Sequence, residues 1–178
     1  MHRAGRVYSI VLELRQRTKG CGVVGITESW ATSNISDAEL QIEGMNIFRS
    51  DRKSGIGGGV ILYVDEKLNA SQCQPMTSTE FNDSVWCKVN SGENEKVLIG
   101  VCYRSTASND DNNEKLLQLL DSVSNIKGIS HILMMGDFNY PEIDYNSAMS
   151  NSSDRSHTTR FLIKTQDNFL VQNVLEAT

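Results

Sequence analysis

Short apolar runs separated by polar turns dominate the chain between residues 22 and 135, and they predict buried β-strands. A run rich in Val, Ile and Leu and closed by Gly, Asn, Asp or Ser is typical of a strand in the interior of a sheet. The polar stretch Asn90–Glu95 between two such runs predicts a hairpin with a long turn. The runs are Gly22–Thr27, Val60–Val64, Val85–Val89, Lys96–Tyr103 and Ile132–Met135, with two further candidates at Met45–Ser50 and Val171–Leu175.

The start of the chain has a helical pattern instead. Val7, Ile10, Val11 and Leu14 follow the i, i+3, i+4, i+7 spacing of an amphipathic helix. Residues 1–20 are also rich in Arg and Lys, a combination found in mitochondrial transit peptides. Both interpretations stay open, and we favour a helix packed on a sheet.

Three later segments carry helix signals. Ser36 to Glu39 has the Ser-x-x-Glu form of a capping box, in which serine and glutamate cap the first turn reciprocally. Asp110–Ile126 begins with acids and asparagines and has a leucine-rich side, as expected of a helix packed on a core. Ser156 is a candidate cap for a helix that continues to about Leu170.

Length and composition limit the possible classes of protein. With 178 residues, the chain is expected to form one domain over residues 1–178, long enough to bury a core. It is 39% hydrophobic and 22% charged, as soluble globular proteins are. The net charge of −5 argues against a broadly basic surface that coats nucleic acid, but not against a local site that acts through a metal ion. No apolar run is long enough to span a membrane.

The cysteine and histidine positions argue against zinc and against a disulfide framework. None of the four cysteines forms a C-x-x-C pair, and the three histidines are scattered. We expect free, buried thiols in a reducing compartment at Cys21, Cys73, Cys87 and Cys102. The glycines before Val60 do not match a phosphate-binding loop, because a strand follows them. We interpret them as a close approach between a strand and a loop.

The stretch from His131 to Pro141, HILMMGDFNYP, carries the most specific chemistry. Its apolar strand stops at Gly136, and Asp137 and Asn139 follow at the rim of the sheet, where open α/β sheets bind ligands. On an extended backbone these two side chains point to the same side. The carboxylate suits a hard cation or a water molecule, and the amide suits a phosphate oxygen. A simple turn explains the pair equally well, whereas an EF-hand loop fits poorly because Glu142 stands where glycine is required.

Polar groups also follow two other predicted strands. Glu28 comes directly after Gly22–Thr27, and Tyr103 and Arg104 end the Lys96–Tyr103 run. The segments GITESW, RSDRKSGIGGGVILYV, GVCYRS and MMGDFNYPEID, in this order and spacing, resemble the endonuclease/exonuclease/phosphatase family. Within that family the chain is most similar to the endonuclease domain of non-LTR (LINE-type) retrotransposons, from about residue 6 to the end.

The resemblance implies both a fold and a chemistry. The fold is a four-layer α/β sandwich, incomplete here, in which two mixed β-sheets lie face to face with helices outside. The reaction is hydrolysis of a phosphodiester in DNA with Mg²⁺, or alternatively Mn²⁺, as cofactor, which agrees with the need for a Lewis acid, donors to phosphate and a base for water. By the same resemblance Glu28 ligates the metal, Asp137 orients or activates water, Asn139 holds the scissile phosphate, Tyr103 is the active-site tyrosine and Arg104 faces the phosphate.

The chain departs from the family pattern at both ends. Members have an Asn-bearing strand before the first helix, and their last strands carry an Asp and a Ser-Asp-His whose histidine serves the attacking water. No residue before Val7 fits that Asn, and neither of the two last strands occurs before the sequence ends at Thr178. The segment Ser153–His157 nearly spells the second motif but lies in the loop before the last helix, so we expect His157 to be a solvated loop residue. His131 is expected to begin its strand.

These observations predict the lineage of a DNA-nicking endonuclease, located in the nucleus. We expect little cleavage by this chain alone, because no histidine is placed to accept the proton. The alternatives are a degenerate or domesticated binding scaffold without activity and a phosphatase of the same fold. An uncovered sheet edge is expected around Val23–Ile26 and Ile132–Met135, with poor solubility as its consequence.

Overall fold

The computed structural model describes residues 20–52, 57–74, 81–92 and 95–174. The chain divides into two compact units. The first unit comprises the chain up to Gln74, Asn82–Tyr103 and Gly128–Asp137, and the second comprises Pro75–Phe81, Arg104–Lys127 and Phe138–Thr178. The helix expected around Val7–Leu14 lies outside the described residues, and the single domain stays a prediction.

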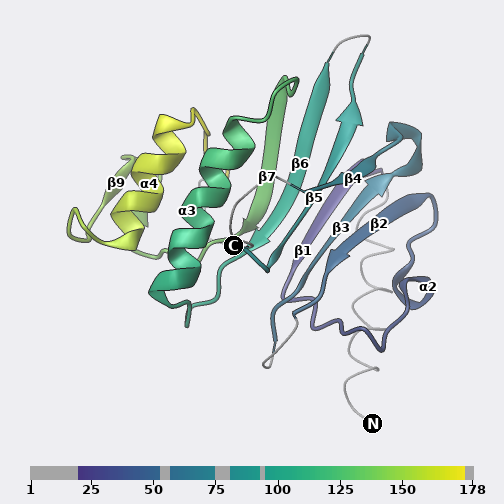
Figure 1. Ribbon diagram of the computed structural model, residues 1–178, viewed down its shortest axis with the longest axis horizontal. Helices are drawn as coiled ribbons and strands as arrows, with labels where there is room; N and C mark the ends of the chain where they lie inside the picture. The colour runs from purple at the N-terminus through teal and green to yellow at the C-terminus, as the bar shows by residue number, and fades with distance from the viewer. Residues whose placement is uncertain (1–19, 53–56, 75–80, 93–94, 175–178) are drawn as a thin grey trace. The chain divides into compact units, whose positions relative to one another are not determined.

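Two β-sheets form the first unit (Figure 1). The first sheet is antiparallel and has the strand order β1 (Val23–Thr27), β3 (Val60–Asp65), β2 (Met45–Ser50). The second has the order β4 (Ser71–Cys73), β5 (Ser84–Asn90), β6 (Lys96–Tyr103), β7 (His131–Asp137), and it is mixed because β6 and β7 are parallel. The predicted α/β sandwich class is confirmed, although only the second sheet is mixed among the described strands.

The main core of the first unit lies between the two sheets. Side chains from β3, β5 and β6 fill it, because alternate residues of a strand face the same side. Gly25 lets β1 approach the second sheet closely, since a Cβ at this position would lie 2.8 Å from a methyl group of Val101. The buried members are Val60, Leu62, Val64, Val85, Cys87, Val89, Ile99, Val101 and Tyr103.

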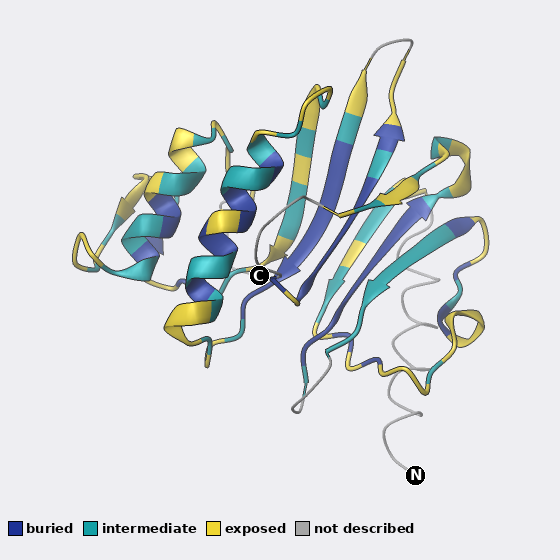
Figure 2. Ribbon diagram, in the orientation of Figure 1, coloured by how far each residue is buried: buried dark blue, intermediate teal, exposed yellow. Residues whose placement is uncertain are grey.

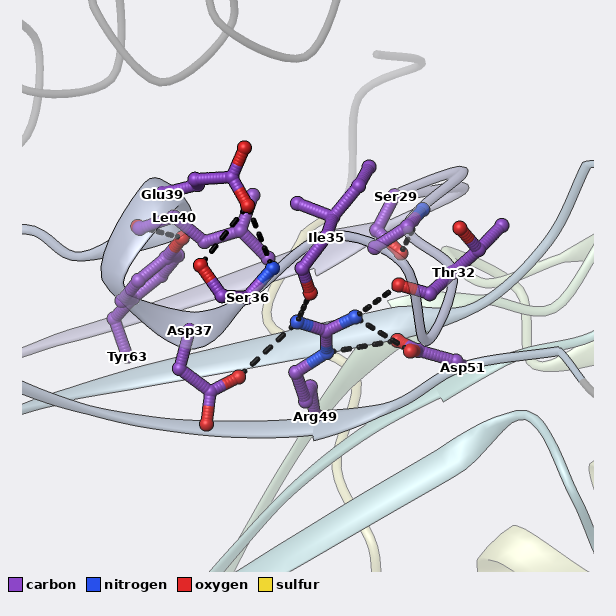
Figure 3. Close-up of polar contacts among 11 residues, drawn as sticks. Ser29, Thr32, Ile35, Ser36, Asp37, Glu39, Leu40, Arg49, Asp51 and Tyr63 are labelled. Atoms are coloured by element: carbon purple, nitrogen blue, oxygen red, sulfur yellow. Dashed lines mark hydrogen bonds and ion pairs between the residues drawn. The ribbon is translucent and has the colours of Figure 1, made fainter. Parts of the chain in front are cut away.

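A second apolar cluster covers the opposite face of the first sheet. The one-turn helix α2 (Asp37–Leu40) belongs to it and has the predicted capping box, in which the Glu39 carboxylate accepts the Ser36 N–H at 2.8 Å. The Tyr63 hydroxyl donates to the Leu40 carbonyl at 2.7 Å and so ties the helix to β3 (Figure 3). The buried members are Ala31, Leu40, Ile42, Met45, Ile61 and Tyr63.

Arg49 of β2 fixes the loop between β1 and α2 (Figure 3). Its guanidinium donates to the carbonyl oxygens of Ile35 and Thr32 at 2.7 and 2.9 Å, and its Nε donates to Asp51 at 2.9 Å. The planar, five-donor guanidinium of arginine suits such a set of acceptors. The loop that directly follows Glu28 is therefore held by side-chain hydrogen bonds.

Two helices, α3 (Asp110–Ser124) and α4 (His157–Asp167), pack against each other in the second unit (Figure 1). Asn109 caps α3 by accepting the Asn112 N–H at 2.9 Å, and Ser156 caps α4 by accepting the Thr159 N–H at 3.1 Å, which confirms the predicted Ser156 cap. The buried side of α3 consists of Asn113, Leu116, Leu117, Leu119, Leu120 and Val123. The same unit contains the strand pair β8 (Ile143–Asp144) and β9 (Met149–Ser150).

Several predicted boundaries are wrong. Residues 171–174 form no strand, and α4 ends at Asp167 rather than near Leu170. The strand β7 does not stop at Gly136 but continues to Asp137, because its parallel pairing with β6 continues to that residue. The sequence pattern also missed β4, β8, β9 and the 3-10 turn Glu66–Leu68, which are too short to show a period.

The strands β1 and β7 each lie at an edge of their sheet. None of their residues is fully buried, whereas β3, β5 and β6 are buried along most of their length (Figure 2). Leu133, in the middle of β7, is 41% exposed. Among the described strands, the uncovered edges expected around Val23–Ile26 and Ile132–Met135 are present, and poor solubility stays a prediction.

The four cysteines are free thiols, but only two of them are buried. Burial raises the pKa of the Cys87 thiol to about 12, and it raises the pKa of Cys102 further. Cys73 is partly buried and Cys21 is exposed, so the expectation of four buried thiols is wrong at these two positions. Among the helices in the described ranges, none has the length and hydropathy needed to cross a membrane.

Candidate functional site

The side chains of Glu28 and Tyr103 meet in the first unit. Glu28 directly follows β1, and Tyr103 is the last residue of β6. The Tyr103 hydroxyl donates a hydrogen bond to the Glu28 carboxylate, although the two residues lie 75 positions apart in the sequence. Glu28 also has a φ of +52°, a left-handed conformation that non-glycine residues rarely adopt and that concentrates at functional sites.

The glycines before β3 hold the backbone beyond Glu28. The Ser29 N–H donates to the Gly59 carbonyl at 3.1 Å, and the Trp30 N–H donates to the Gly58 carbonyl at 3.0 Å. Gly59 has a φ of +76°, and a Cβ there would lie 2.8 Å from the Ser29 hydroxyl oxygen. This agrees with the interpretation of the glycines as a close approach between a strand and a loop.

Asp137 ends β7 beside the same tyrosine. In the parallel pairing of β6 and β7, Asp137 is the register partner of Tyr103. The preceding Gly136 allows this approach, because a Cβ there would lie 2.0 Å from the Cys102 carbonyl oxygen. The first unit therefore brings together three of the predicted site residues: Glu28 and Tyr103 by a hydrogen bond, and Asp137 by strand register.

Arg104 and Asn139 lie in the second unit and bind each other. The Arg104 guanidinium donates to the Asn139 carbonyl at 2.8 Å and to Asn113 at 2.8 Å, and its carbon lies 4.0 Å from the centre of the Tyr140 ring. The Asn139 amide donates to the Arg104 carbonyl at 2.7 Å. Arg104 is buried, so its observed contacts are with the protein, and contact with a phosphate stays a prediction.

The expectation that Asp137 and Asn139 point to the same side of an extended backbone is wrong. Asn139 has a φ of +50°, so the chain is not extended there, and the alternation of side chains along an extended strand does not apply to the pair Asp137 and Asn139. Asparagine tolerates the left-handed region better than most residues, which explains its presence after Phe138.

Two charged residues at this place were missed. The Arg52 guanidinium donates to the Asp83 carboxylate through Nη2 at 2.7 Å and through Nε at 3.4 Å. The central guanidinium carbon of Arg52, Cζ, lies 5.9 Å from the centre of the Tyr103 ring. The hydrogen bond to Asp83 raises the pKa of Arg52, and the nearby Tyr103 and Glu28 raise it further. No local pattern joins residues 31 positions apart, so no motif in the sequence indicates this pair.

The histidines have other surroundings. His157 is the first residue of α4, not a loop residue, and it is only 23% exposed, so the prediction of a solvated loop histidine is wrong. Its ring nitrogens lie 3.2 Å from Asp110 and 3.6 Å from Glu114, both on α3. His131 begins β7, as predicted, at the end of the strand opposite Asp137.

The donor set of the site fits a water-rich cation. No group of three or more His, Cys, Asp or Glu side chains able to enclose a metal occurs among the residues that the structure describes. Mg²⁺ usually takes only one or two carboxylates and keeps several waters. The exposed carboxylate of Glu28 at the rim of the sheet meets that requirement without a protein-built cage.

The comparisons support the fold. No protein-family model and no curated protein matches the sequence. Solved structures do match. An AP endonuclease from Leishmania major matches with a TM-score of 0.66 and 12% identity, over 90% of this chain and 63% of that one. An AP endonuclease from Archaeoglobus fulgidus matches with a TM-score of 0.56 and 13% identity, over 91% of this chain and 65% of that one. The 2′,3′-cyclic phosphatase ANGEL2 also matches, with a TM-score of 0.52 and 16% identity, over 78% of this chain and 44% of that one.

At these identities the likeness establishes the fold alone. The chain has the α/β sandwich fold of these solved structures. It spans less than two thirds of the length of each of these structures.

Proposed function

We propose that this chain carries part of the active site of a Mg²⁺-dependent phosphodiester hydrolase that acts on DNA, of the lineage of LINE-type retrotransposon endonucleases. The observation that carries the proposal is the hydrogen bond from Tyr103 to Glu28 at the end of β6, where Asp137 is the register partner of the same tyrosine. A carboxylate, a phenol and a second carboxylate at one rim suit the handling of a phosphate and a water molecule. A nuclear location would follow from this lineage.

The roles of the residues follow from their chemistry. Glu28, oriented by the Tyr103 hydroxyl, would hold the metal ion. The ion, when bound, supplies Lewis-acid stabilisation of charge on the phosphate oxygens. Asp137 would accept a hydrogen bond from the attacking water, and the Asn139 amide would donate to a phosphate oxygen. Arg104 would contribute by holding the Asn139 backbone, and its contact with phosphate is a further part of the proposal.

Cleavage by the isolated chain would be weak. A general base usually contributes roughly 10²–10⁴-fold to the rate. Within the described residues, His131 lies at the opposite end of β7 from Asp137, and both ring nitrogens of His157 face acids of α3. Binding of metal and DNA should therefore be easier to detect than turnover.

The test combines binding with nicking. Mn²⁺ binding is measured by proton relaxation, duplex binding by fluorescence anisotropy, and cleavage on supercoiled plasmid with Mg²⁺. The variants are Glu28→Ala, Asp137→Ala and Asn139→Ala, with Glu66→Gln as the matched control, because Glu66 is exposed at the other end of β3 from Gly59.

We expect Glu28→Ala to abolish Mn²⁺ binding, Asp137→Ala to abolish the weak nicking, and Glu66→Gln to change neither. Unchanged Mn²⁺ binding in Glu28→Ala would remove Glu28 from the metal role. Hydrolysis of 2′,3′-cyclic nucleotides without DNA binding would favour the phosphatase alternative. The same assays are repeated on a chain extended by the Asn-bearing and Ser-Asp-His strands of the family. DNA binding without turnover in both chains would favour the binding scaffold.

A further inference from the structure

A partly buried ion pair between Arg52 and Asp83 lies near the Tyr103 ring. The Asp83 side chain is 9% exposed and receives two hydrogen bonds from Arg52, whose side chain is 24% exposed. Asp83 Oδ1 also accepts the Gly59 N–H at 3.2 Å. A carboxylate this deeply buried stays charged at low cost only when such partners compensate it.

Asp83 connects the backbone segments that carry the two site residues. Its carbonyl accepts the Tyr103 N–H at 2.8 Å, which fixes the end of β6. The Gly59 bound by its carboxylate accepts the N–H of Ser29, the residue after Glu28. One buried aspartate is therefore linked to both sides of the contact between Glu28 and Tyr103.

Arg52 reaches the site from the same aspartate. Its guanidinium lies near the Tyr103 ring, and the nearby Glu28 carboxylate adds to the effect of Asp83 in raising the pKa of Arg52. Gly58 provides the space, because a Cβ there would lie 2.4 Å from the guanidinium. The planar group of arginine can bind a carboxylate side-on and approach an aromatic ring at once, which the ammonium of lysine cannot do equally well.

We infer that Arg52, held by Asp83, is a positioning residue that keeps the Tyr103 ring directed at Glu28. The inference rests on the proposed function in one respect, namely that the Glu28–Tyr103 contact is the working site. Arg52 touches neither substrate nor metal in this role, and it acts through the tyrosine. If the Arg52–Asp83 pair were purely structural, it would hold the loop after β2 against the start of β5 without influencing the Tyr103 side chain.

Arg49 is the matched control. It lies three residues earlier on the same segment, is likewise paired with acids, and contacts the loop carbonyls of Thr32 and Ile35 rather than Tyr103 (Figure 3). The variants are Arg52→Lys, the neutral pair Arg52→Gln with Asp83→Asn, and Arg49→Lys. In the neutral pair, each of the two side chains keeps the other as a hydrogen-bond partner, so this variant is expected to stay folded. Thermal melting of each variant checks that it is folded.

The first readout is fluorine NMR of fluorotyrosine-labelled, metal-free protein. The chain has five tyrosines, and Tyr103→Phe identifies the resonance of Tyr103. We expect both Arg52 variants to move this resonance in the direction seen in Glu28→Gln, whereas Arg49→Lys leaves it in place. A Tyr103 resonance that stays as in Arg49→Lys in both Arg52 variants would overturn the inference.

The second readout is nicking of supercoiled DNA. A misdirected Tyr103 should lower kcat in Arg52→Lys by about 10-fold to 100-fold with little change in KM, since a small displacement in a site has effects of this size. If the parent neither binds Mn²⁺ through Glu28 nor nicks DNA, the proposed function fails. The metal-free NMR comparison still decides whether Arg52 holds Tyr103, so the two failures are distinguishable.

Discussion

The two compact units use arginine in different ways. In the first unit, Arg52 is paired with the carboxylate of Asp83 and lies near the Tyr103 ring. In the second unit, Arg104 donates instead to backbone carbonyls and to the Asn113 side chain, and it stacks on Tyr140. Arg52 therefore contacts the side chains of Asp83 and Tyr103, whereas most hydrogen bonds that the Arg104 guanidinium donates go to the backbone at Phe138 and Asn139.

The difference explains how each unit tolerates an unusual backbone conformation. Glu28 and Asn139 both have positive φ values, which cost free energy unless the surroundings hold them. Around Glu28 the holding groups are glycine carbonyls organised by Asp83, and around Asn139 they are the guanidinium and carbonyl of Arg104. Substitutions that separate these two arrangements test the comparison.

The largest effect is expected for Asp83→Ala. It leaves Arg52 without its acid and the Gly59 N–H without its acceptor, so we expect a loss of about 3 kcal/mol in the free energy of unfolding, as for other broken buried pairs. Urea denaturation followed by tryptophan fluorescence measures it. Asp83→Asn keeps one acceptor oxygen for the Gly59 N–H but loses the charge and one of the two oxygens that Arg52 binds, so it should cost less than Asp83→Ala. Equal costs for the two variants would contradict the contribution of the hydrogen bond to Gly59.

Arg104→Lys should follow, with a loss of about 2 kcal/mol. Lysine keeps the charge but cannot donate to Asn113, Phe138 and Asn139 together, and hydrogen bonds from a charged donor contribute about 1.5–3 kcal/mol each. Hydrogen exchange should quicken in Phe138–Tyr140 while β6 stays protected. Equal acceleration around Glu28 would mean that Arg104 does not act locally on Phe138–Tyr140.

The two tyrosines give a smaller contrast. The Tyr103 hydroxyl binds Glu28, whereas no hydrogen bond of ordinary geometry to the buried Tyr140 hydroxyl occurs among the described residues. Tyr103→Phe should therefore cost about 1 kcal/mol, and Tyr140→Phe should stay within about 0.5 kcal/mol of the parent or stabilise it. Paired urea melts measure both, and a larger loss for Tyr140→Phe would contradict the contrast.

The smallest effect concerns an exposed pair between α3 and α4. The hydrogen bond from Arg160 lowers the pKa of Glu114, so the pair stabilises the fold above the ordinary glutamate pKa and loses this contribution as the pH falls through the lowered pKa. Because the Glu114 side chain is 40% exposed, screening limits the contribution to less than about 1 kcal/mol. Glu114→Gln should lower stability slightly at neutral pH and match the parent in acid, as urea melts across that pH range can check.

Most of the regular structure could be predicted because it depends on local patterns. Val60–Val64, Val85–Val89 and Lys96–Tyr103 are mainly apolar runs, and each lies in a strand that is buried along most of its length. The Ser156 cap and the capping box at Ser36 need only residues within one turn. The strands β8 and β9, two residues each, contain too few positions to show alternation.

The candidate site divides in the same way. The sequence by itself determined which side chains stand at strand ends, because Glu28, Tyr103 and Asp137 end or directly follow apolar runs. Only the tertiary structure decided that Tyr103 binds Glu28, that Asp83 pairs with Arg52, and that Asn139 leaves the extended conformation. The physical reason is that these contacts join positions far apart in the chain, and sheet pairing and side-chain packing, not local periodicity, bring such positions together.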